Sequence, residues 1–311
     1  MAVELVSMER LQFGPGGPVR AASALARFGD GWLVAQDDAN HAAWWRPDSG
    51  TIERIRLLPA RDGLDVFGDA DGTKHLKPDF EAACDVATDP AGAVLLLGSG
   101  SLPRRTRGVL VRAMPDCPLV RSADLAPLYE RVRHALGLRP TQLNLEGACV
   151  VGDRMRWFQR GHGPTGVASA SVDLPLHDLL ATIEEGRPAA SVEIGDVRRY
   201  EFGTLCGQPL AITDAVLLPD GRICVSATAE DAPDAIADGP VAGSVLGLLD
   251  GGGGSVEILP LDEAVAGCKV EGLAVLPTHR SQLRLLAVVD EDDPTVGSIA
   301  LTLGLGEVAP G

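Results

Sequence analysis

Five short phrases with one hydrophobic and polar pattern recur along the chain, spaced by about 60 residues. Each phrase has an acidic residue or a serine, then a small residue, then an apolar run that predicts a buried strand. The phrases are Ala22–Ala26, Asp79–Asp85, Asn144–Val150, Ile212–Leu218 and Lys269–Val275. We call the acidic residue or serine of each phrase its anchor, and the anchors are Ser23, Glu81, Glu146, Asp214 and Glu271.

Each phrase is followed by further strand patterns. A turn such as Asp89–Gly92 supplies the backbone conformations of a tight hairpin. The second strand, for example Ala93–Leu97, is apolar nearly throughout, and a third, for example Gly108–Arg112, follows a polar loop. Alternating segments such as Arg121–Leu125 and Ala170–Leu174 suit a fourth, outer strand with one solvated face.

A four-stranded antiparallel unit repeated in a ring is a β-propeller. We therefore predict an all-β fold with a single domain over residues 1–311 and five blades. The last repeat shows only three strands, so the N-terminal segment Val3–Glu9 is predicted to add its outer strand and close the ring. Six blades is the alternative, with the extra blade formed by Leu57–Thr73 or Ser191–Thr204. Two short helices, Ala126–Leu136 and Leu176–Glu185, are predicted to pack on blade edges.

The repeat geometry predicts where the anchors lie. In an antiparallel blade, the start of the first strand and the end of the second lie at the same edge. The anchors should therefore gather at one mouth of the central channel, rimmed by loops such as Gln36–His41 and Asp290–Asp293. Converging carboxylates repel one another and need a cation, a bound proton or basic partners. Oxygen ligands suit Ca²⁺ or Mg²⁺, and the predicted metal ligands are Glu81, Glu146, Asp214, Glu271 and Asn144.

Basic partners are the second interpretation of the same acids. Lys77 and Lys269 lie shortly before anchors and could neutralise them by ion pairing. In a third interpretation, each acid accepts backbone hydrogen bonds at a blade junction and has a structural role only. The arginines that follow Ser99 suit bidentate contact with an anion, although a solvated turn fits the same residues. The predicted ligand-binding residues are Arg160, Arg104, Arg105, Ser99, Lys77 and Lys269.

Candidate catalytic side chains are few. His41 and His162 occupy similar rim positions and are predicted general bases, with a plain surface location as the alternative for each. The sequence contains no Gly-x-Ser-x-Gly, phosphate loop, dinucleotide fingerprint or His-Glu-x-x-His. It therefore points to none of the familiar nucleophile or nucleotide chemistries.

Composition narrows the choice of partners. The net charge of −16 makes this an acidic protein that nucleic acids and anionic membranes would repel. The N-terminus lacks the features of a secretory signal, and no apolar run is long enough to span a membrane. The six cysteines form no Cys-x-x-Cys pair and are interpreted as reduced thiols. We expect a cytoplasmic protein that binds a small molecule, and neither nucleic acid nor membrane.

The phrases Lys77–Ala82, Asn144–Ala148 and Lys269–Leu273 resemble the Glu-Gly blade motifs of an uncharacterised group of bacterial β-propellers. That group is similar to the esterase-like phytase and SdiA-regulated propellers and, more distantly, to the gluconolactonase-like calcium propellers. The resemblance implies a calcium-bound site at the channel mouth and hydrolysis of esters, lactones or phosphates. Glu81, Glu146 and Glu271 are the matching positions, whereas Asp214 and Ser23 depart from the pattern.

Two functions are therefore carried forward. The first is a small-molecule-binding propeller with an acidic, cation-binding channel mouth, acting as a metal-dependent ester, lactone or phosphate hydrolase. The alternative is a non-catalytic scaffold that binds a protein or peptide on one face of the ring.

Overall fold

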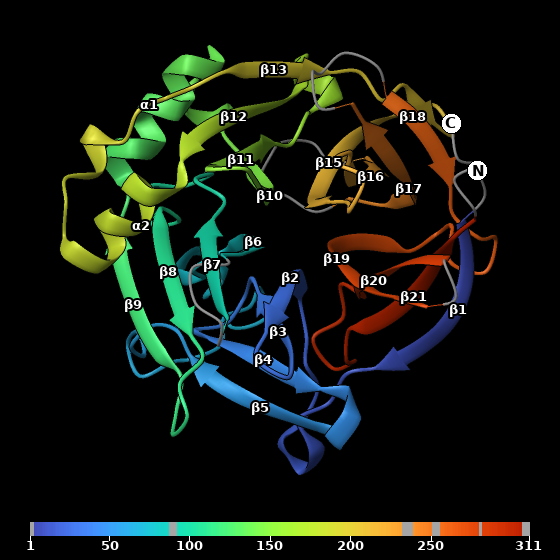
Figure 1. Cartoon of the computed structure of the whole chain (residues 1–311), viewed down its shortest axis with the longest axis horizontal. Coiled ribbons are helices and arrows are strands. Elements are labelled where there is room, and N and C mark those ends of the chain that lie inside the picture. The colour runs from blue at the N-terminus through green and yellow to red at the C-terminus, as the bar shows by residue number, and fades with distance from the viewer. Residues whose placement is uncertain (1–2, 87–91, 232–238, 251–255, 280–281, 307–311) are drawn as a thin grey trace.

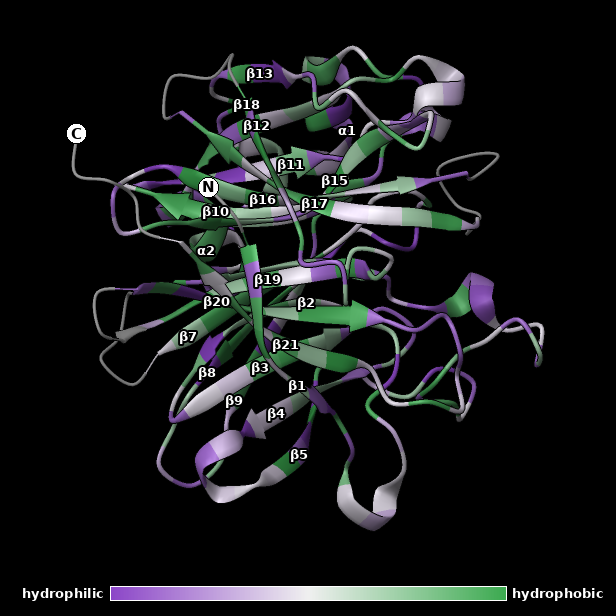
Figure 2. Ribbon diagram, turned by 90° about the vertical axis from the view of Figure 1, so that its right-hand side faces the viewer, coloured by the Kyte–Doolittle hydropathy of each residue, from purple (hydrophilic) through white to green (hydrophobic). Residues whose placement is uncertain are grey.

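The computed structural model describes residues 3–86, 92–231, 239–250, 256–279 and 282–306. Within these ranges, five antiparallel sheets follow one another around a central axis (Figure 1). This arrangement confirms the predicted five-bladed β-propeller. In side view, hydrophobic colour follows the strands and the projecting loops are largely hydrophilic (Figure 2). No helix in the described ranges is long and apolar enough to cross a membrane.

The first two blades have four strands each, in simple up-and-down order. Blade 1 contains β2 (Ala22–Phe28), β3 (Gly31–Gln36), β4 (His41–Arg46) and β5 (Thr51–Arg56). Blade 2 contains β6 (Phe80–Asp85), β7 (Ala93–Gly98), β8 (Arg107–Arg112) and β9 (Leu119–Asp124).

The next two blades keep the same order, and the fourth has one short extra strand. Blade 3 contains β10 (Leu145–Val151), β11 (Arg154–Gln159), β12 (Ser169–Pro175) and β13 (Val197–Tyr200). Blade 4 contains β14 (Thr204–Leu205), β15 (Gln208–Leu217), β16 (Ile223–Glu230), β17 (Val241–Leu249) and β18 (Val256–Pro260).

Blade 5 closes the ring with both ends of the chain. It contains β19 (Lys269–His279), β20 (Gln282–Asp290) and β21 (Ile299–Leu305), and its outer strand is β1 (Val3–Arg10). β1 pairs antiparallel with β21, from Val3 opposite Leu305 to Arg10 opposite Ile299. The predicted closure by the N-terminal strand is confirmed, and it covers an edge that would otherwise be free to pair.

Other predictions about the elements have mixed outcomes. The six-blade alternative is wrong, because Leu57–Thr73 adds no strand to any sheet and Ser191–Thr204 supplies β13, the outer strand of blade 3. Ala170–Leu174, predicted as an outer strand, lies within β12, the third strand. The helices α1 (Ala126–Leu136) and α2 (Leu176–Glu185) have the predicted bounds. They lie along the outer side of blades 2 and 3 (Figure 1), and α2 contacts β8 and β9 of blade 2.

The first strand of every blade carries a β-bulge near its start. The register shifts fall at Ser23, Glu81, Glu146–Gly147, Thr213 and Glu271. Four of the five predicted anchors are therefore bulged, but the equivalent position in blade 4 is Thr213, one residue before Asp214. A bulge turns a side chain out of the regular alternation.

The glycines of the Glu-Gly phrases allow neighbouring first strands to approach each other closely. A Cβ on Gly147, whose φ is +75°, would lie 2.7 Å from the Cα of Asp214 in blade 4. A Cβ on Gly272 would lie 3.0 Å from the Cα of Ala24 in blade 1. Only glycine leaves enough room at such contacts, so Glu-Gly combines a bulged acid with a tight junction between blades.

Candidate functional site

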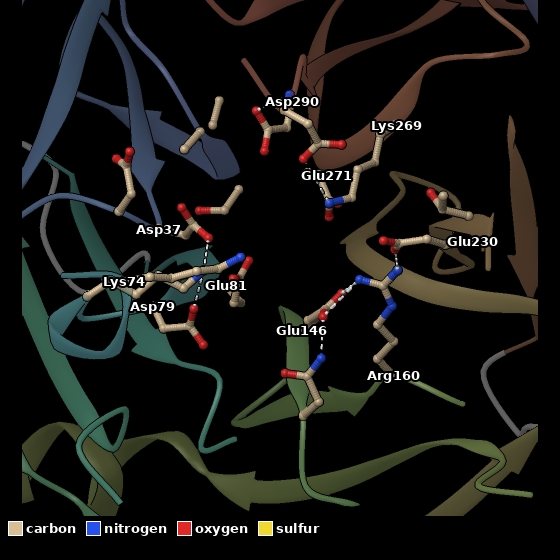
Figure 3. A pocket seen from close by; sticks show the side chains of 18 of the residues that line it. Asp37, Lys74, Asp79, Glu81, Glu146, Arg160, Glu230, Lys269, Glu271 and Asp290 are labelled. Carbon is tan, nitrogen blue, oxygen red and sulfur yellow. Dashed lines mark hydrogen bonds and ion pairs between the residues drawn. The ribbon is translucent and has the colours of Figure 1, made fainter. Parts of the chain in front are cut away.

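A cavity of about 400 Å³ opens at the mouth of the central channel, and we call it the mouth cavity. All five blades contribute to its wall, and Ser23, Glu81, Glu146 and Glu271 all line it. Residues that follow the second strands, among them Asp37, complete the rim. Figure 3 shows the acidic and basic side chains of the wall directed toward a common centre.

Asp214, a predicted metal ligand, is absent from this wall and fully buried. Its Oδ2 accepts the backbone N–H of Leu273 at 2.6 Å. Burial raises the pKa of Asp214 well above its ordinary value, although hydrogen bonds from the backbone of Leu273, Ala215 and Ala148 act against that rise. The structure therefore places Asp214 at the junction of blades 3, 4 and 5 and away from any ligand in the cavity.

The hydroxyl residues at bulged positions tie neighbouring blades together. Ser23 Oγ donates to the carbonyl oxygen of Phe80 at 2.5 Å, and Thr213 Oγ1 donates to that of Val270 at 2.6 Å. Phe80 and Val270 each precede a glutamate anchor in the chain. Ser23 and Thr213 thus hold the backbone from which a glutamate of the neighbouring blade extends.

On the blade 2 side, Lys77 and Arg105 neutralise a buried aspartate. Lys77 Nζ lies 2.7 Å from Asp79 Oδ1 and also pairs with Asp37, and Arg105 Nη1 lies 2.9 Å from Asp79 Oδ2. Ser99 also donates to Asp79 Oδ2. Burial acts to raise the pKa of Asp79, but the charges of Lys77 and Arg105 outweigh it and hold that pKa below its ordinary value. Asp79 is therefore ionised and fully engaged.

On the blade 3 side, Arg160 joins two glutamates. Its Nη1 lies 3.2 Å from both carboxylate oxygens of Glu146, and its Nη2 lies 2.5 Å from Glu230 Oε2. Asn144 Nδ2 donates to Glu146 Oε1 at 2.7 Å. Burial raises the pKa of Glu146 to about 8, and Arg160 only partly opposes that rise. Asn144 and Arg160 thus fix the position of a carboxyl group whose pKa lies above its ordinary value.

On the blade 5 side, Lys269 has the corresponding role. Its Nζ lies 3.2 Å from Glu271 Oε1 and 3.6 Å from Asp292 Oδ1. Burial acts to lower the pKa of Lys269, but the charges of Glu271, Glu230 and Asp292 outweigh it and raise that pKa well above its ordinary value. Lys269 therefore stays charged, as the interpretation of ion pairing expected.

Among the carboxyl groups of the wall that are not exposed, two have no basic partner in the described part of the chain; the other unpaired acids of the wall, Asp71 and Asp293, are exposed. Glu81 makes no hydrogen bond or ion pair there, and Asp290 accepts only the backbone N–H of Asp292, at 3.2 Å. Burial, followed by the charges of Asp79 and Asp37, raises the pKa of Glu81 well above its ordinary value. Burial likewise raises the pKa of Asp290 to about 8. Glu81 and Asp290 are therefore the partly buried acids of the wall that can accept further hydrogen bonds.

Among the described residues, one group of wall carboxylates lies close enough together for a metal. Asp37, Asp79 and Glu81 each present an oxygen within 4.8 Å of the others. The ammonium of Lys77 already contacts Asp37 and Asp79, however, and so holds the position of a cation between them. Ca²⁺ takes six to eight oxygen ligands, and Glu81 alone is uncommitted. The arrangement as it stands does not fit the expected metal.

The remaining predicted site residues are divided between the cavity and the outside. His162 lines the cavity, with Nδ1 2.9 Å from Thr165 Oγ1. His41 lies on β4 outside the wall, 3.3 Å from Arg54 Nε, and burial followed by the charge of Arg54 lowers its pKa to about 4. Arg104 is exposed outside the wall, and Ser99 is buried behind Asp79.

Sequence reasoning missed Asp37, Asp79, Glu230 and Asp290 as individual site residues, although the loops that hold three of them were expected at the rim. Asp79 carries a signal that was available. It stands between Lys77 and Glu81 in one short charged segment, although the positive φ of Asp79 and the bulge at Glu81 mean that strand alternation does not predict where its side chain points.

Comparison with known proteins places the chain in a family. A family profile matches residues 18–305, almost the whole chain. The chain belongs to a family of unknown function, DUF6929. None of the curated proteins matches the sequence.

Several solved structures are similar to this DUF6929 protein at low identity. Glutaminyl cyclase from Myxococcus xanthus has a TM-score of 0.49 at 11% identity, over 98% of each chain. MPT-4, a mannose phosphorylase from Leishmania mexicana, has a TM-score of 0.48 at 12% identity, over 96% of this chain and 88% of its own. The gluconolactonase XC5397 from Xanthomonas campestris has a TM-score of 0.38 at 11% identity, over 97% of each chain. The assignment as a propeller rests on the strand pairing of this chain, and the resemblance to phytase-like and SdiA-regulated propellers stays a prediction.

Proposed function

We propose that this DUF6929 protein binds a small molecule in the mouth cavity. The observation that carries the proposal is the cavity itself, about 400 Å³ with a wall that converges from all five blades. Pockets of this size with a few fixed polar groups are the usual form of small-molecule sites. Much of the wall stands on strand ends, so those groups are already in place before a ligand arrives, whereas Phe67, Lys74 and Lys77 belong to the long segment between β5 and β6.

Hydrolysis of an uncharged ester or lactone is the second candidate. Glu146 favours it, because its pKa is raised to about 8 and Asn144 and Arg160 fix its position. A carboxyl group of that kind can donate a proton to a leaving oxygen at neutral pH. His162, at the same wall, is the candidate base that would activate water.

Calcium or magnesium has no step in this proposal. A metal at Asp37, Asp79 and Glu81 would have to displace the ammonium of Lys77, which contacts two of the three. The predicted metal dependence is therefore kept as one arm of the test. A melting temperature that rises with CaCl₂ and falls with EDTA would support the predicted metal dependence.

Thermal melts against a panel of small amines, sugars, carboxylates and esters test the binding proposal. We expect a subset to raise the melting temperature, with the effect lost in Arg160→Met and kept in Glu257→Gln, which alters an exposed acid on β18. Turnover of aryl esters or lactones that Glu146→Gln abolishes would establish the hydrolase. If all melts are flat and a protein partner binds the ring face, the scaffold alternative replaces both proposals.

A further inference from the structure

The lysine and arginine side chains that line the mouth cavity in the described part of the chain are all engaged. Each of the six that line it has a carboxylate within ion-pair distance: Arg20 with Asp38, Lys74 with Asp69, Lys77 with Asp37 and Asp79, Arg105 with Asp79, Arg160 with Glu146 and Glu230, and Lys269 with Glu271 and Asp292. Except at Lys74, whose partner Asp69 is exposed, an anionic ligand would have to separate ion pairs that are largely buried, which is strongly unfavourable. The wall is therefore built against phosphate and carboxylate ligands.

The acids of the same wall are left in excess. Glu81 has no partner within the described chain, and Asp290 has only one backbone N–H. Figure 3 shows Glu81, Asp37 and Asp290, which come from blades 2, 1 and 5, around the same cavity. Because Asp37 already shares Lys77, Glu81 is the acceptor that a positive group entering here would meet, and the charge of that group would favour the ionised form of the Glu81 carboxyl group.

The geometry favours an ammonium group over a metal ion at Glu81. A metal would need several uncommitted oxygens, whereas an ammonium group needs only one carboxylate and further hydrogen-bond acceptors. Lys77 shows the same chemistry at its neighbours, since its Nζ lies 2.7 Å from Asp79 Oδ1. A ligand ammonium group at Glu81 would make the same kind of contact that Lys77 makes with Asp79.

The first strand of blade 4 contributes an apolar part of the wall, although Thr228 and Glu230 of its second strand are polar. At two residues before the bulged position, blades 2, 3 and 5 present Asp79, Asn144 and Lys269, whereas blades 1 and 4 present Ala21 and Ala211. Pro209 and Ala211 line the cavity together with Pro164. The loop at Gly163 packs directly on Pro209, because a Cβ on Gly163 would lie 2.3 Å from Pro209 Cγ. These residues form a fixed apolar wall that suits a hydrocarbon group.

We infer that the ligand of the mouth cavity is a small primary amine with a compact apolar body. Its ammonium group binds Glu81, and its body packs against Pro209 and Ala211. The inference rests on the proposed function and specifies the class of ligand.

Isothermal titration calorimetry with three simple probes tests it: n-butylamine, n-butyrate and CaCl₂. We expect n-butylamine to bind and n-butyrate not to bind. Glu81→Gln removes the unpaired carboxyl group and should weaken the binding of n-butylamine by about tenfold or more, since a charge-assisted contact is lost. Glu257→Gln, an exposed acid on β18, is the matched control and should bind as the wild type does.

The apolar wall is tested separately with Ala211→Leu. Leucine should occupy the space of the butyl group and so weaken the binding of n-butylamine. Methylamine, which has no butyl group, should bind as before. Binding of n-butylamine that neither Glu81→Gln nor Ala211→Leu changes would overturn the inference. A melting curve for each variant verifies that the variant is folded.

The two proposals fail in different ways. If CaCl₂ or n-butyrate binds and n-butylamine does not, the ligand class is wrong but binding in the mouth cavity stands. If none of the three probes binds and the wider panel of small molecules is also silent, the proposed function itself fails.

Discussion

The bulged position of the first strand has two different roles around the ring. In blades 1 and 4 it holds Ser23 and Thr213, whose hydroxyls donate to backbone carbonyls of neighbouring blades. In blades 2, 3 and 5 it holds Glu81, Glu146 and Glu271, whose carboxyl groups line the mouth cavity. The backbone irregularity is common to all five blades, and the side chain determines whether it supports a junction or a site.

This contrast explains why the repeat is clear in the sequence while its chemistry is not. A structural repeat needs only a residue that tolerates the bulge and a strand that follows it. Serine and threonine are short enough to reach the adjacent backbone, whereas glutamate extends past it toward the axis. Variants that alter one role and spare the other can therefore separate the two.

The largest effect is expected for Asp79→Ala. The change leaves Lys77 and Arg105 without a shared carboxylate in a buried place, which typically costs about 3–5 kcal/mol. The free energy of unfolding in urea measures the loss. Asp69→Ala, at a side chain that is 78% exposed, is the control and should change little. A loss of similar size in both variants would show that the blade 2 network is not special.

Gly147→Ala should cause the next largest loss of stability. The new Cβ would lie 2.7 Å from Asp214 Cα, at a backbone φ of +75°. Overpacking and the unfavourable conformation together should cost about 1–3 kcal/mol or more. Gly152→Ala is a close match, since Gly152 has a φ of +64° with open space around it. The difference between the two variants isolates the close approach of neighbouring blades.

Thr213→Val tests the junction role directly. It removes the hydrogen bond to Val270 and leaves that carbonyl group buried, at a cost of about 1–3 kcal/mol. Glu81→Gln, at the equivalent bulge of blade 2, breaks no hydrogen bond or ion pair in the described chain and should keep the stability of the wild type. Equal losses in urea would remove the distinction between the two kinds of anchor.

The stability of the protein should depend on pH through the buried carboxyl groups of the mouth cavity. The pKa of Glu146 is about 8 in the folded protein against an ordinary value of 4.5, so the folded state holds a proton that the unfolded state releases. This contribution is fully present below about pH 4.5 and is lost as the pH rises through about 8. Asp290, with its pKa also raised to about 8, acts in the same direction. Melting temperatures should fall over this range, and less steeply in Glu146→Gln.

Much of the fold followed from pattern alone, because strands buried on both faces and tight turns leave strong local signals. Five blades and the closing N-terminal strand are confirmed. The assignment of Asp214 as an anchor shows the limit, since a bulge shifts the register by one residue and apolar spacing does not reveal it. Thr213 has the equivalent position, and Asp214 serves the junction.

The site was harder to predict for a similar reason. The acids were expected at the mouth, but the partner of each depends on how side chains from different blades meet. Lys77 joins Asp37 from blade 1 with Asp79 from blade 2, and Arg160 joins Glu146 with Glu230 from blade 4. Nothing in the spacing of these residues along the chain specifies those pairs. Which acids are left over, Glu81 and Asp290 among them, emerges only when all the pairs are known.

The central claim is that the glutamate side of the mouth cavity binds a positive group while the blade 4 side receives an apolar one. A crystal soaked with 4-iodobenzylamine tests both halves together, because the anomalous signal of iodine fixes the orientation of the ligand. We predict the amine at Glu81 and the iodine peak beside Pro209 and Ala211. An iodine peak next to Glu81, or one outside the mouth cavity altogether, would contradict the account.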